Sequence, residues 1–297
     1  MTTAAASAAE FELHRRRLFG LAYQMLGSAD EAEDVVQDTY LRFSGADRER
    51  IEHPAAWLAK VATNLCLTRL TSARARREQY VGSWLPEPVV TSDGTLGPLE
   101  SAEQREAVSL AMLVLLERLT PAERAVYVLR EAFGYGHREI AEVLELSEAN
   151  CRQLYRRAVR RVSTEENRFE PPPERQEELV RSFMTAARDG DLAGLEKLLV
   201  DDATWWTDSG GRVRAARRVI EGSAKIVRFL QGVLPKYAVG MEYRMAEING
   251  AMALAGWTGD ELTIVMSFEL RDGRIAQVHS VMNPDKLGFV RRQLLSA

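Results

Sequence analysis

The sequence predicts a multidomain protein in which two all-α domains precede one α+β domain. Three observations support this fold class. Helical spacing of apolar residues dominates residues 11–80 and 99–161. A stretch rich in Pro or Gly follows each of these segments, and strand-like runs separated by turn signals begin after residue 174. A chain of 297 residues is long enough for two or three domains with cores of their own.

The composition excludes several classes of protein. The chain has 39 Lys and Arg against 43 Asp and Glu, a formal net charge of −4, so any basic surface must be local. Cys66 and Cys151 lie in helical stretches without metal-ligand spacing, and a packed thiol at Cys151 is favoured over a redox thiol. No run approaches the roughly twenty apolar residues that span a bilayer. We expect a cytoplasmic protein without a membrane segment, metal or cofactor.

The first helical segment, residues 11–80, contains two clear helix starts. Ser28 is expected to cap the helix that begins with "ADEAEDVVQDTYLRF", and Pro54 stands where a further helix can begin. In the stretch after Pro54, part of the apolar surface is expected in the core, including Ala56, Val61 and Leu65. The following "VGSWLPEPVVTSDGTLGP" breaks every regular pattern and predicts a linker.

The second helical segment contains helix-turn-helix spacing. A helix over residues 137–144, a turn at 145–146 and a second helix over 148–162 capped by Ser147 are expected in order. "RFEPPPER" then ends the segment, because three consecutive prolines cannot continue a helix. The first helix is expected to bury Ile140, Ala141 and Leu144.

The second helix of this unit carries five arginines and one acid. In a helix-turn-helix unit the first residues of this helix meet base edges in the major groove and its later residues meet phosphates. The alternative is an arginine-rich solvated face. The residues expected at DNA are Ser147, Asn150, Arg152, Gln153, Arg156, Arg157, Arg160 and Arg161.

The tail after residue 174 has a different character. An amphipathic helix over 179–199, interrupted at Gly190, precedes the strand-like runs "ATWWTD", "MEYRMAEI", "AMALAGW", "LTIVMSFEL" and "RIAQVHSVM". Turns are expected at Ser209-Gly210-Gly211, Asn249-Gly250 and Asp272-Gly273, and a helix over 223–233 interrupts the strands. This pattern predicts a curved, mostly antiparallel sheet with helices packed on it.

Residues 11–162 resemble an extracytoplasmic-function (ECF) sigma factor of the sigma-70 family. A region-two domain would cover about residues 11–80 and a region-four domain about residues 102–162. "ADEAEDVVQDTYLRF" resembles the family's grip on the clamp helices of core RNA polymerase, and "PAAWLAKVATNLCLTRL" resembles the helix pair that melts and reads the minus-ten element. "LTPAERAVYVLREAFGYGHREIAEVLELSEANCRQLYRRAVRR" resembles the minus-thirty-five reader, with Glu145 in place of the turn's common glycine.

The resemblance implies further contact residues. The acidic residues of the first motif suit a basic partner, although a solvated acidic face is the alternative. An aromatic side chain, an amide and cations along the second motif suit unpaired bases and backbone, and residues 45–53 correspond to the loop that captures a flipped base. The expected polymerase contacts are Asp30, Glu31, Asp34, Gln37 and Asp38, and the expected minus-ten contacts are Trp57, Lys60, Asn64 and Arg69.

The tail, over residues 173–287, resembles a SnoaL-like domain of the NTF2-like fold. "WLPEP" at 84–88, "DSGGR" at 208–212 and "NPDKL" at 283–287 resemble the motifs of ECF sigma factors whose fused SnoaL-like extension replaces an anti-sigma factor. "DSGGR" departs from the family's glycine-richer, lysine-ended form at Ser209 and Arg212.

The three motifs predict a contact between linker and tail. Pro86 and Pro88 stiffen the linker and present Trp84 and Leu85 as an anchor that needs an apolar receiving surface, while "NPDKL" is expected to form a turn after the last strand. The alternative is that Trp84 covers the region-four bundle. The expected contact residues are Trp84, Leu85, Pro86, Asp208, Gly210, Gly211, Arg212, Asn283, Pro284, Asp285 and Lys286.

The sequence therefore predicts a transcription initiation factor that binds core RNA polymerase and promoter DNA, is regulated by its own tail, and is monomeric when free. One rival is a ligand-sensing helix-turn-helix regulator. The other is a SnoaL-like cyclase or isomerase with a pocket lined by Asp208, His279, Tyr237, Trp205, Trp206 and Trp257. A bound small molecule in the tail stays open. The expected domains are region two (1–80), linker (81–101), region four (102–165), Pro-rich linker (166–174) and SnoaL-like domain (175–297).

Overall fold

The computed structural model describes residues 3–47, 50–96, 102–162, 173–237 and 240–296. The chain forms two compact units, one of residues 1–78 and 93–164 and the other of residues 79–92 and 165–297. The first part of the expected linker therefore belongs to the same unit as the tail. Residues 97–101 of that linker, residues 48–49 of the expected base-capture loop and most of the expected Pro-rich linker lie outside the described residues.

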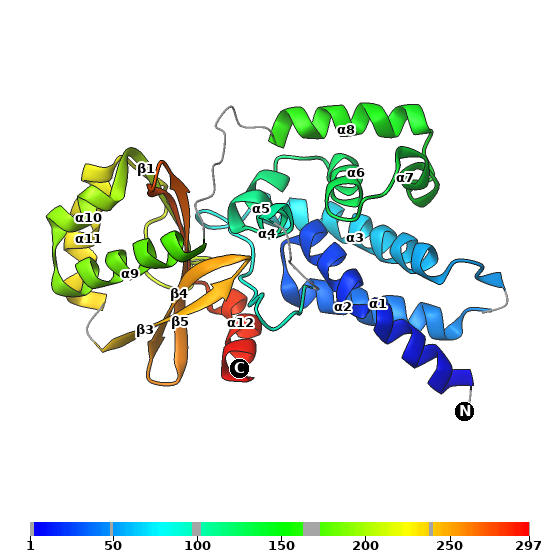
Figure 1. Cartoon of the computed structure of the whole chain (residues 1–297), viewed down its shortest axis with the longest axis horizontal. Helices are drawn as coiled ribbons and strands as arrows, with labels where there is room; N and C mark the ends of the chain where they lie inside the picture. Colours follow the sequence, from blue (N-terminus) through cyan, green and yellow to red (C-terminus); the bar gives the residue numbers. More distant parts are fainter. Residues whose placement is uncertain (1–2, 48–49, 97–101, 163–172, 238–239, 297) are drawn as a thin grey trace. The chain divides into compact units, whose positions relative to one another are not determined.

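The first unit begins with three long helices, drawn blue to cyan in Figure 1: α1 (Thr3–Leu26), α2 (Ala29–Gly45) and α3 (Pro54–Glu78). Ser28 caps α2 as predicted, because its hydroxyl accepts a hydrogen bond from the backbone N–H of Glu31 at 3.1 Å.

The expected burial along α3 was partly wrong. Val61 and Leu65 are half-buried and Ala56 is exposed, whereas Leu58, Ala62 and Cys66 are fully buried. Residues 58, 62 and 66 recur every four positions and so lie on one face of the helix, which is the face that meets the neighbouring helices.

The rest of the first unit contains five shorter helices: α4 (Ala102–Ala107), α5 (Leu110–Leu116), α6 (Pro121–Glu131), α7 (His137–Leu144) and α8 (Glu148–Val162). The predicted helix-turn-helix is confirmed in α7 and α8. Glu145 ends α7 in the left-handed conformation at φ 56°, which is the geometry for which glycine is the usual choice.

The buried face of α7 differs in one position from the prediction. Ile140 and Ala141 are buried, but Leu144 is half-buried and Val143 is buried instead. The reason is that α7 packs against α3, α6 and α8 together, so its buried arc is wider than the single stripe that the sequence pattern suggested.

The second unit opens with α9 (Pro173–Asp189) and α10 (Leu192–Leu198), where the sequence predicted one interrupted helix. Gly190 adopts φ 70°, and the Asp191 side chain caps α10 by accepting from the Gly194 N–H at 2.8 Å. A glycine in the left-handed conformation followed by a strong N-cap separates the two helices.

The sheet of the second unit contains β1 (Leu199–Asp208), β2 (Ile220–Glu221), β3 (Met241–Ile248), β4 (Ala251–Thr258), β5 (Glu261–Arg271) and β6 (Arg274–Val281). Its order is β2-β1-β6-β5-β4-β3, with β1 parallel to β6 and all other pairs antiparallel. The predicted mostly antiparallel sheet is confirmed. The turns at Asn249-Gly250 and Asp272-Gly273 have positive φ at both residues, as the sequence predicted for tight hairpins.

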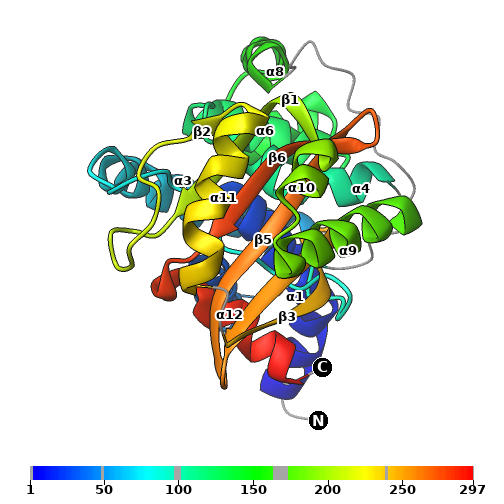
Figure 2. The same cartoon turned by 90° about the vertical axis from the view of Figure 1, so that its left-hand side faces the viewer.

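Helices cover both faces of this sheet. On one face lie α9, α10 and α11 (Ser223–Tyr237), around a core that includes Val180, Phe183, Trp205 and Phe268 (Figure 2). On the other face lies α12 (Pro284–Ser296), which packs on β5.

The helix α12 was missed, since "NPDKL" was expected to form a turn. Asn283 Oδ1 accepts from the Asp285 N–H at 3.1 Å, and Pro284 occupies the first helical position, where it needs no hydrogen-bond partner for its nitrogen.

Both cysteines are fully buried free thiols. Burial raises the pKa of the Cys66 thiol to about 12, and burial followed by the nearby Glu148 raises the pKa of Cys151. We therefore expect neither thiol to react with an aromatic disulfide reagent at pH 8 in the native protein, and both to react in guanidinium chloride. Rapid labelling of Cys151 in the native protein would contradict the packed-thiol assignment.

Candidate functional site

Two acidic residues of α2 form ion pairs within the first unit. Arg69 of α3 forms ion pairs with Asp34 at 3.2 Å and Asp38 at 2.9 Å. Arg69 was expected at minus-ten DNA, but here it ties α3 to α2. The residues of α2 that are exposed include Asp30, Asp34 and Gln37, together with Glu33, which the expected contact set omitted; Glu31 and Asp38 are half-buried.

The expected minus-ten residues on α3 have different surroundings. Trp57 is half-buried and packs against Phe43, with ring centroids 5.8 Å apart. Lys60 forms an ion pair at 2.9 Å with Glu145 in the turn of the helix-turn-helix, and Asn64 is exposed.

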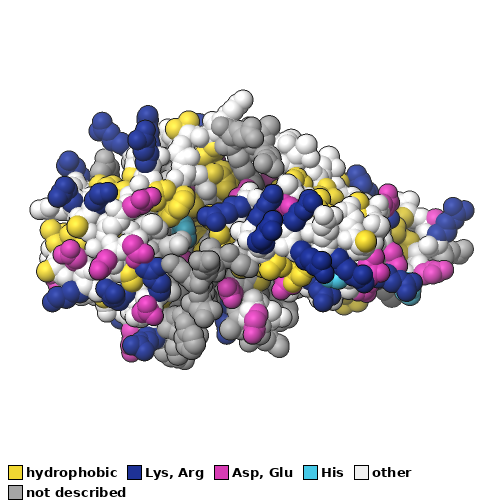
Figure 3. Space-filling view, turned by 90° about the horizontal axis from the view of Figure 1, so that it is seen from above, with side chains coloured by type: hydrophobic (Ala, Val, Ile, Leu, Met, Phe, Trp, Pro, Cys, Tyr) yellow, Lys and Arg dark blue, Asp and Glu magenta, His cyan; other side chains and the backbone are white. Residues whose placement is uncertain are grey.

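The helix α8 presents a basic outer face. Ser147 accepts from the Asn150 N–H at 3.2 Å, and the inner face buries Cys151, Ala158 and Val162. Lys and Arg side chains gather over this helix in Figure 3, which views the molecule from the side on which α8 lies in Figure 1. Two arginines have acidic partners, Arg152 with Glu148 and Arg161 with Glu123, both at 2.5 Å. The exposed candidates for DNA are Ser147, Asn150, Arg152, Gln153, Arg156, Arg157, Arg160 and Arg161.

A buried arginine joins the α6–α8 helices to the first three helices of the unit. Arg124 is 2% exposed; its Nε donates to the carbonyl of Gln24 at 3.0 Å, and it forms an ion pair with Glu117. Because α3 and α8 both belong to this unit, the residues of the two helices that were expected at DNA are held within one compact body.

In the second unit, the carboxylate of Asp208 at the end of β1 is fully buried and accepts four hydrogen bonds. Its Oδ1 accepts from the Tyr80 hydroxyl at 2.5 Å and from the Gly210 N–H at 3.1 Å. Its Oδ2 accepts from the Leu85 N–H at 2.8 Å and from the Lys286 ammonium at 2.7 Å. One carboxylate thus connects the linker, the turn after β1 and α12, and we call this cluster the Asp208 junction.

The cation of the Asp208 junction is buried as well. Lys286 is 7% exposed; its ammonium donates to the Leu85 carbonyl at 2.5 Å and lies 4.1 Å from the Trp84 ring centroid and 4.9 Å from that of Tyr80. The half-buried ring of Trp84 covers this cation, a contact that the sequence did not predict, while Leu85, the other residue of the expected anchor, is fully buried. A buried ammonium needs such partners because it has lost its hydration.

The glycines of "DSGGR" are required by close packing. Gly210 and Gly211 adopt φ 56° and 72°, and a Cβ at Gly210 would lie 2.5 Å from Asn283 Nδ2. Asn283 in turn donates to the Tyr80 hydroxyl at 2.8 Å. Burial, and next the hydrogen bond to Asp208, raise the pKa of Tyr80, which keeps this hydroxyl a donor. By contrast, Arg212 and Asp285 form an exposed pair at 3.0 Å, of a kind that contributes little to stability.

Beyond the junction, residues 85–91 are all buried and extend along the sheet edge. Val90 forms an antiparallel bridge with Ile248, and the flanking bonds run from the Thr91 N–H to the Glu247 carbonyl at 3.1 Å and from the Asn249 N–H to the Val89 carbonyl at 2.9 Å. Gln293 of α12 binds both the N–H and the carbonyl of Val90, at 2.9 and 3.2 Å. Pro86 and Pro88 bring no N–H that would need a partner in this buried position.

The sequence analysis missed several residues of this contact, among them Tyr80, Glu247, Asn249 and Gln293. Among these residues, only the Asn249-Gly250 turn had a recognisable sequence pattern. That pattern indicates a hairpin between two strands and does not predict that the linker binds beside them.

The pocket expected for an enzyme does not form from the residues proposed for it. A cavity of about 1220 Å³ lies between the sheet and helices α9 and α11, and of the six expected lining residues only Trp205 lines it. Asp208 is in the junction, and His279 packs beside Trp206, with ring centroids 6.4 Å apart; the side chain of Tyr237 lies outside the described residues. The acid and the histidine of the cyclase alternative are therefore not in the cavity.

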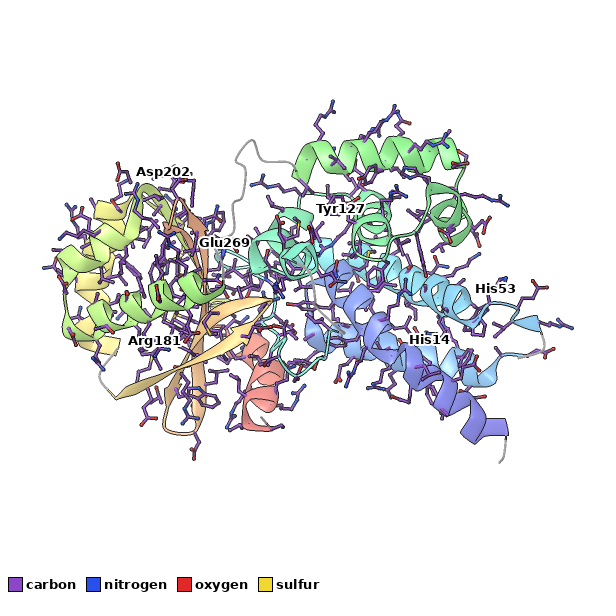
Figure 4. The ribbon with its side chains drawn as sticks, in the orientation of Figure 1. His14, His53, Tyr127, Arg181, Asp202 and Glu269 are labelled. Carbon is purple, nitrogen blue, oxygen red and sulfur yellow. The ribbon has the colours of Figure 1, made fainter. Side chains whose placement is uncertain are left out.

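Other functional classes receive no support from the part of the chain that the structure describes. Within it, no group of three His, Cys, Asp or Glu side chains could hold a metal ion. The labelled histidines come from different elements, with His14 on α1 and His53 before α3 (Figure 4). No helix in the described ranges is long and apolar enough to cross a membrane.

Comparison with known proteins agrees with this geometry. The chain matches the family models "Sigma-70 region 2" over residues 11–76, "Sigma-70, region 4" over 109–162 and "SnoaL-like domain" over 180–278. It is 37% identical to the "ECF RNA polymerase sigma factor SigJ" of Mycobacterium tuberculosis, covering 93% of this chain and 92% of SigJ. It is 30% identical to the "Probable ECF RNA polymerase sigma factor SigI" of the same species, covering 96% of each. The crystal structure of M. tuberculosis SigJ matches with a TM-score of 0.75 and 35% identity, over 94% of this chain and 98% of that one.

Two sigma-70 regions followed by a SnoaL-like domain define a sigma factor with an appended α+β domain. The chain belongs to the ECF RNA polymerase sigma factors of the sigma-70 family.

The Asp208 junction yields a stability prediction. We expect Asp208→Asn and Lys286→Met each to lower the free energy of unfolding of the second unit by about 3–5 kcal/mol, because each leaves a buried partner without its counter-charge. The double variant should lose much less than the sum of the two. Urea unfolding followed by tryptophan emission reports this, since four of the five tryptophans lie in the second unit: Trp84, Trp205, Trp206 and Trp257.

Arg212→Ala, which breaks the exposed pair with Asp285, is the matched control and should change the free energy by less than about 0.5 kcal/mol. Additive losses from the Asp208 and Lys286 variants would show that the two side chains do not stabilise each other.

Proposed function

We propose that this sigma factor binds core RNA polymerase through α2, reads two promoter elements through α3 and α8, and uses its SnoaL-like domain to hold the linker between the two DNA-reading domains. The observation that carries the regulatory part is the Asp208 junction, in which the tail binds linker backbone and side chains. The proposed action is on RNA polymerase in the cytoplasm and involves no catalysis by the chain itself.

The polymerase contact rests on the outer face of α2. Asp30, Glu33 and Gln37 are exposed along one helix, and Asp34 is 65% exposed despite its pairing with Arg69. Such an acidic surface is complementary to a basic partner.

The upstream contact rests on the order of residues along α8. Asn150, Arg152 and Gln153 occupy its first two turns, where a recognition helix meets base edges. Arg156, Arg157 and Arg160 follow on the exposed surface and suit phosphates. Arg161 is held by Glu123, so we assign it the weakest role of the basic set.

Reading both elements at once requires the first unit to open. The elements are named for positions about 25 base pairs apart, which is roughly 85 Å of duplex at about 3.4 Å per base pair. A compact body of the size of the first unit, about 150 residues, has a radius of gyration of only ~15 Å. The exposed Lys60–Glu145 pair costs little to break, whereas the buried Arg124 contacts are the stronger restraint.

The tail sets how far the domains can then separate. If the whole linker were released from the tail, residues 79–101 could span at most about 80 Å, at about 3.5 Å per residue. When residues 79–92 are held in the second unit, the freely extensible part shrinks to residues 93–101, which span at most about 30 Å. The tail thereby restricts which promoter spacings the factor can use.

A ligand-sensing helix-turn-helix regulator was the alternative, and membership of the ECF sigma factors argues against it. It would use α8 in the same way but would need no polymerase contact on α2. Monomeric behaviour of the free protein, and a small-molecule partner for the tail, also remain predictions.

The orientation of α8 is tested by three substitutions. We expect Arg152→Ala and Gln153→Ala to reduce discrimination between matched and scrambled upstream hexamers by about 1–3 kcal/mol each, because base contacts specify sequence. Arg160→Ala should weaken binding to both sequences equally, because phosphate contacts do not depend on the base sequence. The measurement is run-off transcription and promoter binding by the holoenzyme; equal losses on both hexamers for all three variants would reject the orientation.

The linker role is tested with promoters whose spacer length varies one base pair at a time. We expect the wild-type holoenzyme to show a narrow optimum, and Asp208→Ala or Trp84→Ala to broaden it toward other spacings, because both release the linker. Arg212→Ala is the control and should keep the wild-type profile. An unchanged spacing profile in the Asp208 variant, with polymerase binding intact, would refute the proposed role of the tail.

A further inference from the structure

A second basic segment, separate from α8, belongs to the second unit. Residues 209–237, which run from the turn after β1 through β2 and α11, contain seven Lys and Arg and a single acid, Glu221. The whole chain has a net charge of −4, so positive charge is concentrated here as it is on α8. Because like charges repel one another, such a concentration indicates a surface kept for a negatively charged partner.

The loop and the helix that carry these charges lie side by side. Residues 214–216 of the loop line the same cavity as residues of α11 between 229 and 236, so the loop lies against this helix, as Figure 2 shows. On α11, Lys225 and Arg228 are three positions apart and both exposed, and therefore share one outer face. The loop and the helix thus contribute to one surface.

Five exposed cations of this surface form what we call the 214–228 patch: Arg214, Arg217, Arg218, Lys225 and Arg228. In the part of the chain that the structure describes, none of the five forms an ion pair, whereas Arg152 and Arg161 of α8 do. The patch can therefore bind an anion without first breaking an ion pair of its own.

The surroundings of the patch favour a phosphate backbone over a protein surface. Among the described side chains of residues 209–237, Val213 is the only large apolar one that is exposed, at 37%. Protein interfaces have an apolar or aromatic core, and sites for single-stranded nucleic acid use aromatic rings on which bases stack. Long cationic side chains without such groups suit the phosphates of a double helix, which carries one charge per about 1.7 Å of its axis.

We propose that the 214–228 patch binds the phosphate backbone of duplex DNA without reading its sequence. Arginine suits this contact because its planar guanidinium can donate two parallel hydrogen bonds to one phosphate. The contact requires neither α8 nor polymerase, so it stands or fails separately from the function proposed above.

Neutralising one adjacent pair of arginines tests the proposal. We expect Arg217→Gln/Arg218→Gln in the full chain to weaken binding to a mixed-sequence duplex by about tenfold at 50 mM salt and by less than about twofold at 200 mM. The reason is that two phosphate contacts contribute about 1.8 to the slope of log affinity against log salt. Fluorescence anisotropy of a labelled duplex measures both affinities. Lys225→Gln/Arg228→Gln on α11 is an independent second pair with the same expected loss.

The matched control is Arg291→Gln/Arg292→Gln, an adjacent exposed pair on α12, which packs on the other face of the sheet. It removes the same charge and should change the affinity by less than about twofold, because charges far from the bound duplex are screened by salt. Equal losses from the Arg217/Arg218 and Arg291/Arg292 variants would show only an effect of net charge and would overturn the proposal.

The same measurements in an Arg156→Gln/Arg157→Gln background separate the patch from α8. The loss caused by the Arg217/Arg218 change should persist there with a similar fold-change. If the α8 changes alone leave DNA binding unaltered, the assignment of α8 fails and the patch is untouched. Unaltered DNA affinity in both patch variants would overturn the proposal, even where those variants bind core polymerase or phosphatidylglycerol vesicles less well than the wild-type chain.

Discussion

The buried carboxylate of Asp208 is the interaction on which the arrangement of linker and tail depends. A fully buried carboxylate is tolerated only with a full set of donors. Its four donors come from the linker (Tyr80 and Leu85), from the adjacent turn (Gly210) and from the last helix (Lys286). The ammonium of Lys286 then binds the Leu85 carbonyl and stacks under Trp84. Neither charge is stable in this position without the other, so linker, turn and last helix form one cooperative contact.

Side chains alternate between the two faces of β1 and β6, so one face of the sheet lines the cavity and the other forms the linker contact. Thr207 and Ser280 face the cavity, whereas Asp208 belongs to the junction and His279 packs beside Trp206 on the opposite face. The same alternation explains why the acid and histidine of an enzyme-like pocket are absent from the cavity. A sheet of this fold can therefore retain a ligand-sized cavity on one face while its other face binds a segment of the sigma domains' linker.

Local signals predicted most of the fold, because they act over a few residues. The hairpin turns, the Ser28 cap and the helix-turn-helix all follow from neighbouring residues, and each is confirmed. The start of α12 was missed because Pro284 is equally typical of a turn and of a first helical residue. The sequence motifs pointed to Asp208 and Lys286 as a contact, but not to a buried ion pair, since lysine is rarely buried and its partner lies 78 positions away. Arg69 was assigned to DNA because its pairing with α2 depends on how the helices pack.

Hydrogen exchange measures directly whether the tail holds the linker through Asp208. In the native full-length chain, the amides of Leu85, Val89 and Val90 all donate to side chains of the second unit, so we expect exchange as slow as that of the neighbouring strand β3. In Asp208→Ala, exchange at these three amides should accelerate markedly while α1–α3 are unchanged. Fast exchange of residues 85–91 in the wild-type protein, or unaltered protection in the variant, would show that Asp208 does not hold the linker.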